Sequence, residues 1–511
     1  MLRLPIRIAG LPGDGIGPEV FPFAAKLLAA ANQVLGGSEP AFVMHRLPYD
    51  ASYYLQHGKA WPEGTATQLA RDYDAAFLIA LGDNRLREKC GDSMVHARTI
   101  ILDGFRGHSS WFTNLNRRPT RLLHPLLRPT LRAEPVSFRL FALSNHLEEL
   151  IREDVKRRGT PEEEVLPREI HFHAAFRDKL QEAIAAAKAS GEDRVAVLHK
   201  GNVLRYSHGP WEKICQEQEK ISSIKIEFHL MDSFLEKMVK TPHLLPKTLV
   251  TDRAFAALLA PVIEALKEGT RGEIPEDFQL VIGRENTEGM YFRGGGLEGD
   301  TVETSVGTQI GRHTATMVQE NVLATIDIAQ EAGWPGHILH LDDVHPQSYG
   351  LWRREGQEVG TAQGLSLPMM HAGVFVATLI LRPEALSGRV FAADNLLGDL
   401  CGDAAAALVG GLGIAATVSY NTDRSTGKYF FEPLHGSAPD IAGQGKANPT
   451  ATFLTVGELF RAAGHPELQQ AVERTLFNLI AGCIRTPDLG GTATTTAFGE
   501  AFLAEFLRVT G

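Results

Sequence analysis

Short apolar runs alternate with amphipathic stretches along most of the chain, and this alternation predicts an α/β fold. The run Ile6 to Leu11 is typical of a short buried strand. A glycine-rich turn follows it, and Pro18 suits the first turn of the next helix. The turn lacks the GxGxxG spacing of a phosphate-binding loop, so a plain strand-to-helix connection is favoured. The charged segment 145–170, by contrast, is interpreted as a solvated helix and loop.

A second pattern is an internal repeat. The stretch Val197 to Trp211, VLHKGNVLRYSHGPW, recurs in diverged form from Ile338 to Trp352, ILHLDDVHPQSYGLW. Each stretch includes the end of a predicted strand that follows a predicted amphipathic helix. The first helix ends at Gly191 and the second at Gly333. Their apolar stripes are Phe176, Leu180, Ile184 and Ala187, and Val318, Val322, Ile326 and Ala329.

The duplication extends beyond these stretches. Residues 138–140 resemble 278–280, Glu148 stands opposite Glu288, and residues 252–257 resemble 394–399, at offsets of 140 to 142. We therefore interpret residues 130–265 (copy 1) and 272–410 (copy 2) as diverged copies of one unit of about 140 residues, a typical domain size. Chance resemblance would not keep the offset so constant.

Composition narrows the class of protein. The 511 residues are 44% hydrophobic and 22% charged, with a net charge of −10, which argues against nucleic-acid or anionic-membrane binding. The four cysteines (Cys90, Cys215, Cys401 and Cys483) lack the spacing of a disulfide framework or a zinc motif. No apolar run approaches the roughly 20 residues of a transmembrane helix, and the first residues lack the apolar core of a signal peptide. We expect a cytoplasmic enzyme.

Five stretches resemble the β-decarboxylating dehydrogenase family, which includes isocitrate and 3-isopropylmalate dehydrogenases. They occur in family order: LPGDGIGPEV, RENTEGMY, NLLGDLCGDAAAALVGGLG, FEPLHGSAPDIAGQGKANPTA and GGTATTTAF. The resemblance implies an isocitrate/isopropylmalate dehydrogenase-like α/β fold, with a large domain from both chain ends and two tandem copies of the smaller inserted domain. The expected boundaries are 1–129 with 411–511 for the large domain, 130–271 for the first small domain and 272–410 for the second.

The resemblance also implies a cofactor site that differs from the dinucleotide-binding Rossmann fold. The loop after residue 434 would hold the adenosine half, and Asn448 would reach adenine. An acidic Asp440 can accept from both ribose hydroxyls and would repel a 2′-phosphate, which favours NAD. The implied cofactor-binding residues are His435, Gly436, Ser437, Ala438, Asp440, Ile441 and Asn448.

The family's substrate is a polyanionic 2-hydroxy acid with a β-carboxylate, for which arginines are the natural ligands. Arg106, Arg118 and Arg284 match the family's arginines, while Arg117 competes with Arg118. Surface ion pairs are the alternative, most of all for Arg106. Asn202 is placed at the substrate site as well.

The same resemblance implies that the remaining residues would bind a metal ion or transfer protons. Asp399 and Asp403, four apart, would share one face of a helix start and suit Mg²⁺ or Mn²⁺ together with Asp232. Lys200 would remove the C2-hydroxyl proton, which requires a cationic or poorly solvated site or a relay through water. Tyr291 would protonate the enol.

These residues are sorted between the copies. In the family's homodimers, the lysine and one metal aspartate come from the neighbouring subunit. Copy 1 keeps Lys200, Asn202 and Asp232 but has lost the others: Ser144 stands against Arg284, Ile151 against Tyr291, Ala257 against Asp399 and Pro261 against Asp403. Copy 2 keeps those four and has Leu341 in place of the lysine. We hypothesise that copy 1 replaces the partner subunit, which gives one complete site per chain and allows a monomer. A homodimer stays open.

Two alternatives remain at this point. The chain is a catalytically inactive relative that binds NAD or substrate and regulates a partner, or it performs the same chemistry on another 3-substituted malate or tartrate. Ile100 and Leu102 favour an alkyl group as in isopropylmalate, whereas Asp103 beside them does not. The lysine and C-terminal motifs look more like the isocitrate branch, so the substrate stays open between the two.

Overall fold

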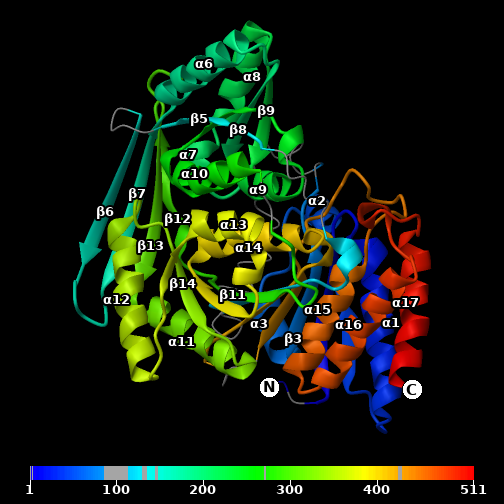
Figure 1. Cartoon of the computed structure of the whole chain (residues 1–511). Helices are drawn as coiled ribbons and strands as arrows, with labels where there is room; N and C mark the ends of the chain where they lie inside the picture. The colour runs from blue at the N-terminus through cyan, green and yellow to red at the C-terminus, as the bar shows by residue number, and fades with distance from the viewer. Residues whose placement is uncertain are drawn as a thin grey trace. The chain divides into compact units, whose positions relative to one another are not determined.

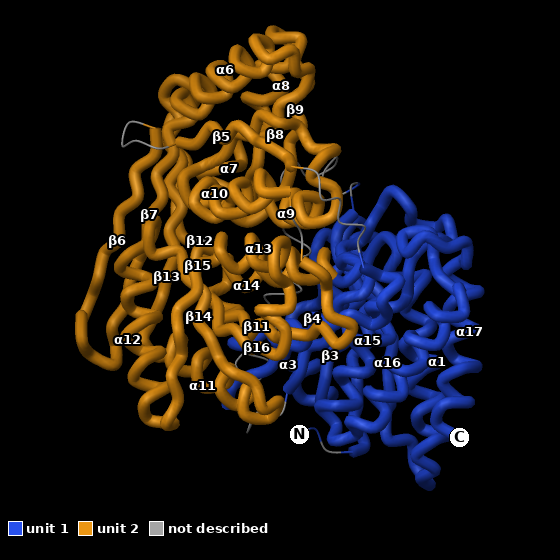
Figure 2. The backbone as a smooth tube through the Cα atoms, viewed as in Figure 1, with its two compact units in different colours: residues 1–128, 409–511 blue, residues 129–408 orange. Residues whose placement is uncertain are grey.

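A computed structural model describes residues 2, 4–83, 85, 113–128, 135–143, 148–269, 272–423 and 428–511. The chain divides into two compact units, shown in Figure 2. Unit 1 comprises Met1–Arg128 and Val409–Gly511, and unit 2 comprises Pro129–Leu408. Unit 1 thus combines both chain ends, and unit 2 contains the described parts of both sequence copies.

Unit 1 is an α/β unit whose first strand covers the predicted apolar run. Its strands follow the order β4-β17-β18-β3-β1-β2, with β1 parallel to both neighbours. The elements are β1 (Ile6–Gly13), α1 (Gly17–Leu35), β2 (Phe42–Arg46), α2 (Ala51–His57), α3 (Thr65–Asp72), β3 (Ala75–Ala80), β4 (Leu115–Arg121), η2 (Pro125–Leu127), η5 (Leu412–Ile414), β17 (Ala416–Tyr420), β18 (Tyr429–Pro433), α15 (Thr450–Ala462), α16 (Pro466–Ala481), η7 (Pro487–Leu489) and α17 (Thr495–Thr510). The predicted strand and the Pro18 helix are confirmed.

Copy 1 and copy 2 fold into closely matching series of elements, which confirms the duplication (Figure 1). They differ at one place, where copy 1 has two helices (205–208 and 211–222) and copy 2 has one (346–362). Copy 1 contains β5 (Arg139–Ala142), β6 (Glu149–Lys156), β7 (Glu164–Phe172), α6 (His173–Ala189), β8 (Arg194–His199), α7 (Arg205–His208), α8 (Trp211–Ser222), β9 (Lys225–Leu230), α9 (Met231–Lys240), η3 (Pro242–Leu244), β10 (Thr248–Thr251) and α10 (Arg253–Glu268). Copy 2 contains β11 (Gln279–Glu285), β12 (Gly289–Glu298), β13 (Val306–Thr314), α11 (Ala315–Ala332), β14 (Gly336–His340), α12 (Pro346–Ala362), β15 (Met369–His371), α13 (Ala372–Leu381), η4 (Pro383–Ala385), β16 (Arg389–Ala393) and α14 (Asn395–Leu408).

The strand order repeats as well. Copy 1 forms the sheet β5-β10-β8-β9, and copy 2 forms the equivalent order β11-β16-β14-β15. The strand pairs assigned within these two runs are parallel. The division of unit 2 into domains at residue 271 stays a prediction, because the two copies belong to one compact unit.

The two copies share a third sheet, β12-β13-β7-β6, to which each contributes a hairpin (Figure 1). Strand β7 pairs with β13 in antiparallel register, so that Glu164 lies opposite Thr314 and Phe172 opposite Val306. Residues 164 and 306, and residues 172 and 314, are equivalent at an offset of 142. Equivalent residues of β7 and β13 thus pair in opposite directions, as they would if a two-fold axis related the two copies.

Helix packing follows the same symmetry. Helix α9 of copy 1 packs on α14 of copy 2, and its equivalent α13 packs on α10. Each copy therefore presents these two helices to the other. The arrangement resembles an interface between two subunits, made here within one chain.

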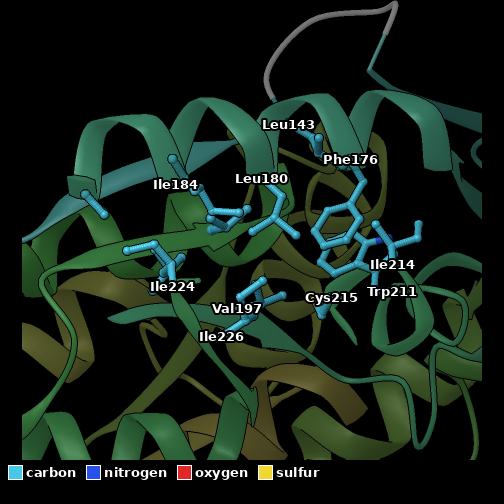
Figure 3. Packing of buried hydrophobic residues seen from close by; sticks show 14 residues of the cluster. Leu143, Phe176, Leu180, Ile184, Val197, Trp211, Ile214, Cys215, Ile224 and Ile226 are labelled. Atoms are coloured by element: carbon cyan, nitrogen blue, oxygen red, sulfur yellow. The ribbon is translucent and has the colours of Figure 1, made fainter. Parts of the chain in front are cut away.

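The core of copy 1 shows how the predicted apolar stripe is used. Phe176, Leu180 and Ile184 of α6 are buried against β8 and α8 (Figure 3). The ring of Phe176 stacks on that of Trp211 with centroids 4.0 Å apart. Burying one such side chain contributes roughly 1.5–3 kcal/mol. Trp352, the equivalent of Trp211, is fully buried too.

One expectation was wrong. Segment 145–170 is largely a β-hairpin of β6 and β7 rather than a solvated helix and loop. Alternate residues of β7 are buried, and so are the charged side chains of Glu149, Glu163 and Glu169. The hairpin forms because β13 of copy 2 supplies the neighbouring strand, a contact that local charge content does not reveal.

The described cysteines Cys215, Cys401 and Cys483 are free thiols, as expected, and Cys90 lies outside the described residues. Among the helices in the described ranges, none has the length and apolar character needed to cross a membrane.

Candidate active site

Lys200 lies at the carboxyl end of β8 and is 1% exposed. Its ammonium group contacts two carboxylates: Nζ is 2.6 Å from Asp232 Oδ2 and 2.9 Å from Asp399 Oδ2. Asp232 belongs to copy 1, whereas Asp399 belongs to copy 2. The structure therefore brings together residues that the two copies had divided between them.

Asp399 is the centre of this group. Besides Lys200, it accepts hydrogen bonds from Arg284 Nη1 at 2.6 Å and from Tyr291 Oη at 2.8 Å. The Arg284 guanidinium group lies 5.5 Å from the centroid of the Tyr291 ring. Asn395, one turn earlier on α14, accepts from Nε and Nη2 of Arg284 at 3.0 and 2.7 Å. Arg284 is thus held by two residues four apart on one helix face.

The packing of α9 on α14 explains this convergence. Asp232 is in the first turn of α9, and Asp399 is on α14. Because the two helices pack across the two-fold relation, copy 1 supplies the lysine side of the site and copy 2 the arginine and tyrosine side.

Asp403 and Asn202 are placed less centrally. Asp403 follows Asp399 by one turn of α14 and is buried, so the predicted shared helix face is confirmed. Asn202 is exposed on the turn after Lys200.

Neighbouring charges strongly affect the pKa values of Lys200 and Tyr291. Burial by itself would lower the pKa of Lys200, but Asp399 and the other acidic groups around it raise this pKa well above its usual value. The site is poorly solvated, as expected for a base, but it is anionic rather than cationic. Burial, and then the Asp399 carboxylate, raise the pKa of Tyr291 well above its usual value. Both groups hold their protons.

The carboxylates Asp232, Asp399 and Asp403 fit a hard divalent cation. They offer only oxygen donors, which Mg²⁺ and Mn²⁺ prefer. Two of them already share one cationic group, Lys200 Nζ, so they lie close enough together to favour positive charge.

The equivalent position on the other side of the two-fold relation lacks this chemistry. Leu341 occupies the lysine position and is buried. Gly373 occupies the position of Asp232, and a Cβ atom there would lie 2.5 Å from Leu258 O and 2.9 Å from Pro261 Cγ. A side chain at residue 373 does not fit without movement of α10. This equivalent position is therefore filled by packing, and within the described residues of unit 2 the contacts of Lys200 with Asp232 and Asp399 have no counterpart there. Ser144 lies outside the described residues.

In unit 1, the predicted cofactor loop contacts the glycine-rich N-terminal turn. Ile16 N donates to Ser437 O at 2.9 Å, and Gly15 has a φ of +59°. A Cβ atom on Gly15 would lie 1.9 Å from Ser437 O, so only glycine allows this approach. The side chain of Asp14 accepts from Ala51 N and Gly82 N, which holds the turn in place.

The loop's polar groups fit a nucleotide. His435 Nε2 is buried and has no hydrogen-bond partner among the described residues, while Asp440 is exposed. Asn448 is held by Asp488 Oδ2, which accepts from its Nδ2 at 2.9 Å. Gly436, Ala438 and Ile441 lie at the surface or partly buried between these residues. An unpartnered ring nitrogen and an exposed carboxylate are suited to base and ribose recognition.

The two competing arginines of unit 1 lie on opposite faces of β4. Arg117 Nη1 donates to Glu458 Oε2 at 2.6 Å, whereas Arg118 Nε donates to Asn116 Oδ1 at 2.9 Å. The charge of Arg117 is thus engaged in a buried ion pair. Arg106, Ile100, Leu102 and Asp103 lie outside the described residues.

Two residues of the site were missed from sequence. Asn395 positions Arg284, and its place four residues before Asp399 in NLLGD was the available signal. His208 Nδ1 accepts from the backbone N–H of Lys200 at 3.0 Å. No local pattern distinguishes this histidine from a histidine in an ordinary core.

Glu285, next to Arg284, provides a test of how the free energy of unfolding depends on pH. It is buried and accepts from Thr287 N at 2.6 Å and Glu288 N at 2.7 Å, and burial, then Glu288, raise its pKa to about 7. Because the folded state binds this proton more tightly, its stabilisation is complete below the ordinary value of 4.5 and is lost as pH rises through about 7. Glu285→Gln should remove up to about 3 kcal/mol of this pH dependence, measured by urea unfolding.

The exposed Glu162 offers the control. Glu162→Gln should leave the slope of stability against pH unchanged. An unchanged slope in Glu285→Gln as well would contradict the assignment.

Comparison with known proteins gives the family context. The sequence profile described as Isocitrate/isopropylmalate dehydrogenase matches twice, over residues 7–259 and 251–502. An isocitrate/homoisocitrate dehydrogenase of Thermus thermophilus is 36% identical over 233 residues, which cover 43% of this chain and 64% of the relative. A 3-isopropylmalate dehydrogenase of Corynebacterium kroppenstedtii is 36% identical over 226 residues, which cover 42% of this chain and 64% of the relative. The matches thus span less than two thirds of the relatives' length.

Solved structures support the fold. The crystal structure of isocitrate dehydrogenase from Methylococcus capsulatus aligns with a TM-score of 0.55 and 18% identity, covering 98% of this chain and 99% of that one. The TT0538 protein from Thermus thermophilus aligns with a TM-score of 0.57 and 17% identity, covering 98% of this chain and 68% of that one.

Proposed function

The chain belongs to the isocitrate/isopropylmalate dehydrogenase family, and from this premise we propose that it is an NAD-linked, metal-dependent enzyme. It would oxidise and decarboxylate a 2-hydroxy acid with a β-carboxylate, of the isocitrate or 3-isopropylmalate class. The observation that carries the proposal is the contact of Lys200 with Asp232 and Asp399. This contact assembles, from two copies in one chain, the residues that the family's chemistry requires.

Binding of the polyanionic substrate would fall to the arginines. Arg284 is pre-organised by Asn395 and Asp399, so its guanidinium group loses little conformational freedom on meeting a carboxylate. Arg118 would contribute from unit 1, with Arg106 and Asn202 as further ligands.

Proton transfer would involve Lys200 and Tyr291. Lys200 Nζ donates to Asp232 and lies within ion-pair distance of Asp399, so it must pass on a proton before it can accept that of the C2 hydroxyl. The C2 hydrogen leaves as hydride, and a ketone forms. The bond between the β-carbon and its carboxylate then breaks, carbon dioxide departs, and the electron pair forms an enolate. Tyr291, protonated here, would supply the proton to that carbon.

Two groups complete the chemistry. A divalent cation held by Asp232, Asp399 and Asp403 would compensate the negative charge of the C2 oxygen. NAD, bound through His435, Ser437, Asp440 and Asn448, would accept the hydride.

The direct test is an assay of NADH formation with purified protein and a panel of 3-substituted malates, including isocitrate and 3-isopropylmalate, with tartrate as well. We expect turnover that needs Mg²⁺ or Mn²⁺ and prefers NAD over NADP. No turnover with any member, despite binding of NAD, would instead favour the inactive regulatory relative.

Mixing two inactive variants tests whether each chain has its own site. Lys200→Met and Asp399→Asn remove residues that a family homodimer would take from different subunits. In such a dimer, mixed subunits restore one intact site. Here both residues belong to unit 2, so we expect no recovery after co-expression or joint refolding. Recovery of activity, with a dimeric mass by light scattering, would contradict the in-chain site.

A further inference from the structure

A second cluster of ionisable side chains lies in copy 1, and the proposed reaction uses none of them directly. It contains two histidines and three carboxylates, all buried, and is here called the His171 cluster: Glu149, Glu169, His171, His208 and Asp252. The donor atoms of His171, His208 and Asp252 all lie within 4.8 Å of one another. Its residues belong to β6, β7 and α7 and to the N-cap of α10.

Each carboxylate of the His171 cluster has one oxygen in a hydrogen bond and one oxygen without a hydrogen-bond partner among the described residues. The latter atoms are buried: Asp252 Oδ2, Glu149 Oε1 and Glu169 Oε2. Within the same part of the chain, both ring nitrogens of His171 are buried without a hydrogen-bond partner, and Nε2 lies 3.8 Å from both Glu149 Oε1 and Glu169 Oε2. The oxygens in use contact backbone or histidine nitrogens: Asp252 Oδ1 accepts from Phe255 N at 2.7 Å, Glu149 Oε2 accepts from Arg253 N at 2.9 Å, and Glu169 Oε1 lies 3.0 Å from His345 Nε2.

His208 shows what the unpartnered atoms favour. Its Nδ1 accepts from Lys200 N, so Nε2 must carry a proton or bind a cation. Nε2 is 2.8 Å from Asp252 Oδ2, yet the two atoms are not aligned as a hydrogen bond, and neither has another hydrogen-bond partner among the described residues. Two ligands of a tetrahedral ion at about 2 Å lie about 3.3 Å apart, so these two atoms would separate by roughly 0.5 Å to share one ion.

Copy 2 provides an internal comparison. Tyr349 stands at the position of His208 and donates to Asp394 Oδ2 at 2.7 Å, where Asp394 is the equivalent of Asp252. Trp352 Nε1 donates to Nδ1 of His313, the equivalent of His171, at 3.2 Å. The same place in copy 2 is therefore closed by hydrogen bonds between its own side chains.

Copy 1 differs in the groups that would bind a cation. Glu149 and Glu169 have no carboxylate counterpart, because the equivalent residues are Gly289 and Gly311. Trp211 Nε1, unlike that of Trp352, has no hydrogen-bond partner in the described part of the chain. Copy 1 thus has a second imidazole and two additional buried carboxylates at one point.

Ionisable groups are concentrated in the cluster. Three buried carboxylates lie beside the imidazoles of His171 and His208, and a further imidazole, that of His345, contacts Glu169. Buried carboxylates need a compensating charge or a proton.

We propose that the His171 cluster binds a divalent transition metal of the zinc type through His171, His208 and Asp252, with Glu149 or Glu169 completing the coordination. Imidazole nitrogen and carboxylate oxygen are ligands that Zn²⁺ accepts in tetrahedral sites. All five side chains are buried, so the site is closed and structural. The ion would fix His208, which supports the backbone of Lys200.

Metal analysis of the full chain, purified without chelator and after removal of any affinity tag, tests the site. After reconstitution with Zn²⁺ and gel filtration we expect about one tightly bound ion per chain. Replacement by Co²⁺ should produce the visible bands of a four- or five-coordinate ion. Removal of the metal by dipicolinate should lower the melting temperature, and added Zn²⁺ should restore it.

His208→Tyr is the informative variant because it copies the closed arrangement of copy 2. It should fold, bind less than about a tenth of the metal and lose the response of the melting temperature to chelator. Two controls should keep the ion and the Co²⁺ bands: Tyr349→Phe, in the equivalent place of copy 2, and Asp399→Asn, which disrupts the proposed magnesium site. Wild-type protein that retains no Zn²⁺ and shows no such Co²⁺ bands overturns the proposal, whether or not His208→Tyr folds. A folded His208→Tyr that retains the ion does so too.

Discussion

Lys200→Met is expected to lower kcat by about 10²- to 10⁴-fold, the usual contribution of a positioned acid–base group. Lys200 contacts both Asp232 and Asp399, and methionine matches its length without a titratable proton. The measurement is the steady-state rate of NADH formation with saturating metal.

Two further variants separate charge from proton transfer. Lys200→Arg keeps a cation beside Asp399 but cannot act as a base, so it should bind substrate and still lose kcat. Leu341→Met changes the equivalent residue of copy 2 and should leave kcat unchanged. Full activity in Lys200→Met, or an equal loss in Leu341→Met, would refute the assignment of the base to copy 1.

Asp399→Asn is expected to lower kcat/KM by about 10³-fold or more and to raise the Mg²⁺ concentration needed for half-maximal rate. A carboxylate that helps bind the cation supplies several kcal/mol of charge stabilisation. The same change weakens the contacts of Arg284 and Tyr291, which both donate to Asp399. Metal titrations of the rate distinguish the two effects, since lost cation affinity is overcome at high Mg²⁺.

The control for lost charge is Asp154→Asn, an exposed carboxylate of β6 that pairs with Arg168. Exposed pairs contribute little, so this variant should have normal kcat/KM and metal dependence. If Asp399→Asn responded to Mg²⁺ like the wild type and kept its rate, the metal assignment would be wrong.

Local patterns predicted a large part of the fold. The apolar stripe Phe176–Leu180–Ile184 correctly predicted helix α6, because the 3.6-residue period of a helix follows from the spacing of apolar residues along the chain. The repeat at a constant offset correctly predicted two copies with closely matching series of elements. The prediction of a solvated helix and loop for residues 145–170 was wrong. The strands of this segment are stabilised by pairing with β13 of copy 2 rather than by their own composition.

Prediction of the site was uneven for a related reason. Motifs predicted Lys200, Arg284, Tyr291 and Asp399 as site residues, since the family resemblance rests on short contiguous stretches, and the structure brings these four side chains into contact. They did not identify the state of Lys200, which is ion-paired and holds its proton. A pKa depends on neighbours in space, and a motif does not contain them.

The sequence by itself determined that this chain carries two copies of one α/β unit and that the residues matching the family's motifs are divided between them. Only the tertiary structure decided that residues from both copies meet at one place. Helix α9 packs on α14, which brings Asp232 and Lys200 to Asp399, while α13 packs on α10, where Gly373 and Pro261 leave no room for a carboxylate. It also decided that His171, His208 and Asp252 meet in a buried cluster whose equivalent in copy 2 is closed by hydrogen bonds. The physical reason is the same in both cases: periodicity and motifs describe neighbours along the chain, whereas charge pairing and steric exclusion act between residues that are distant in sequence.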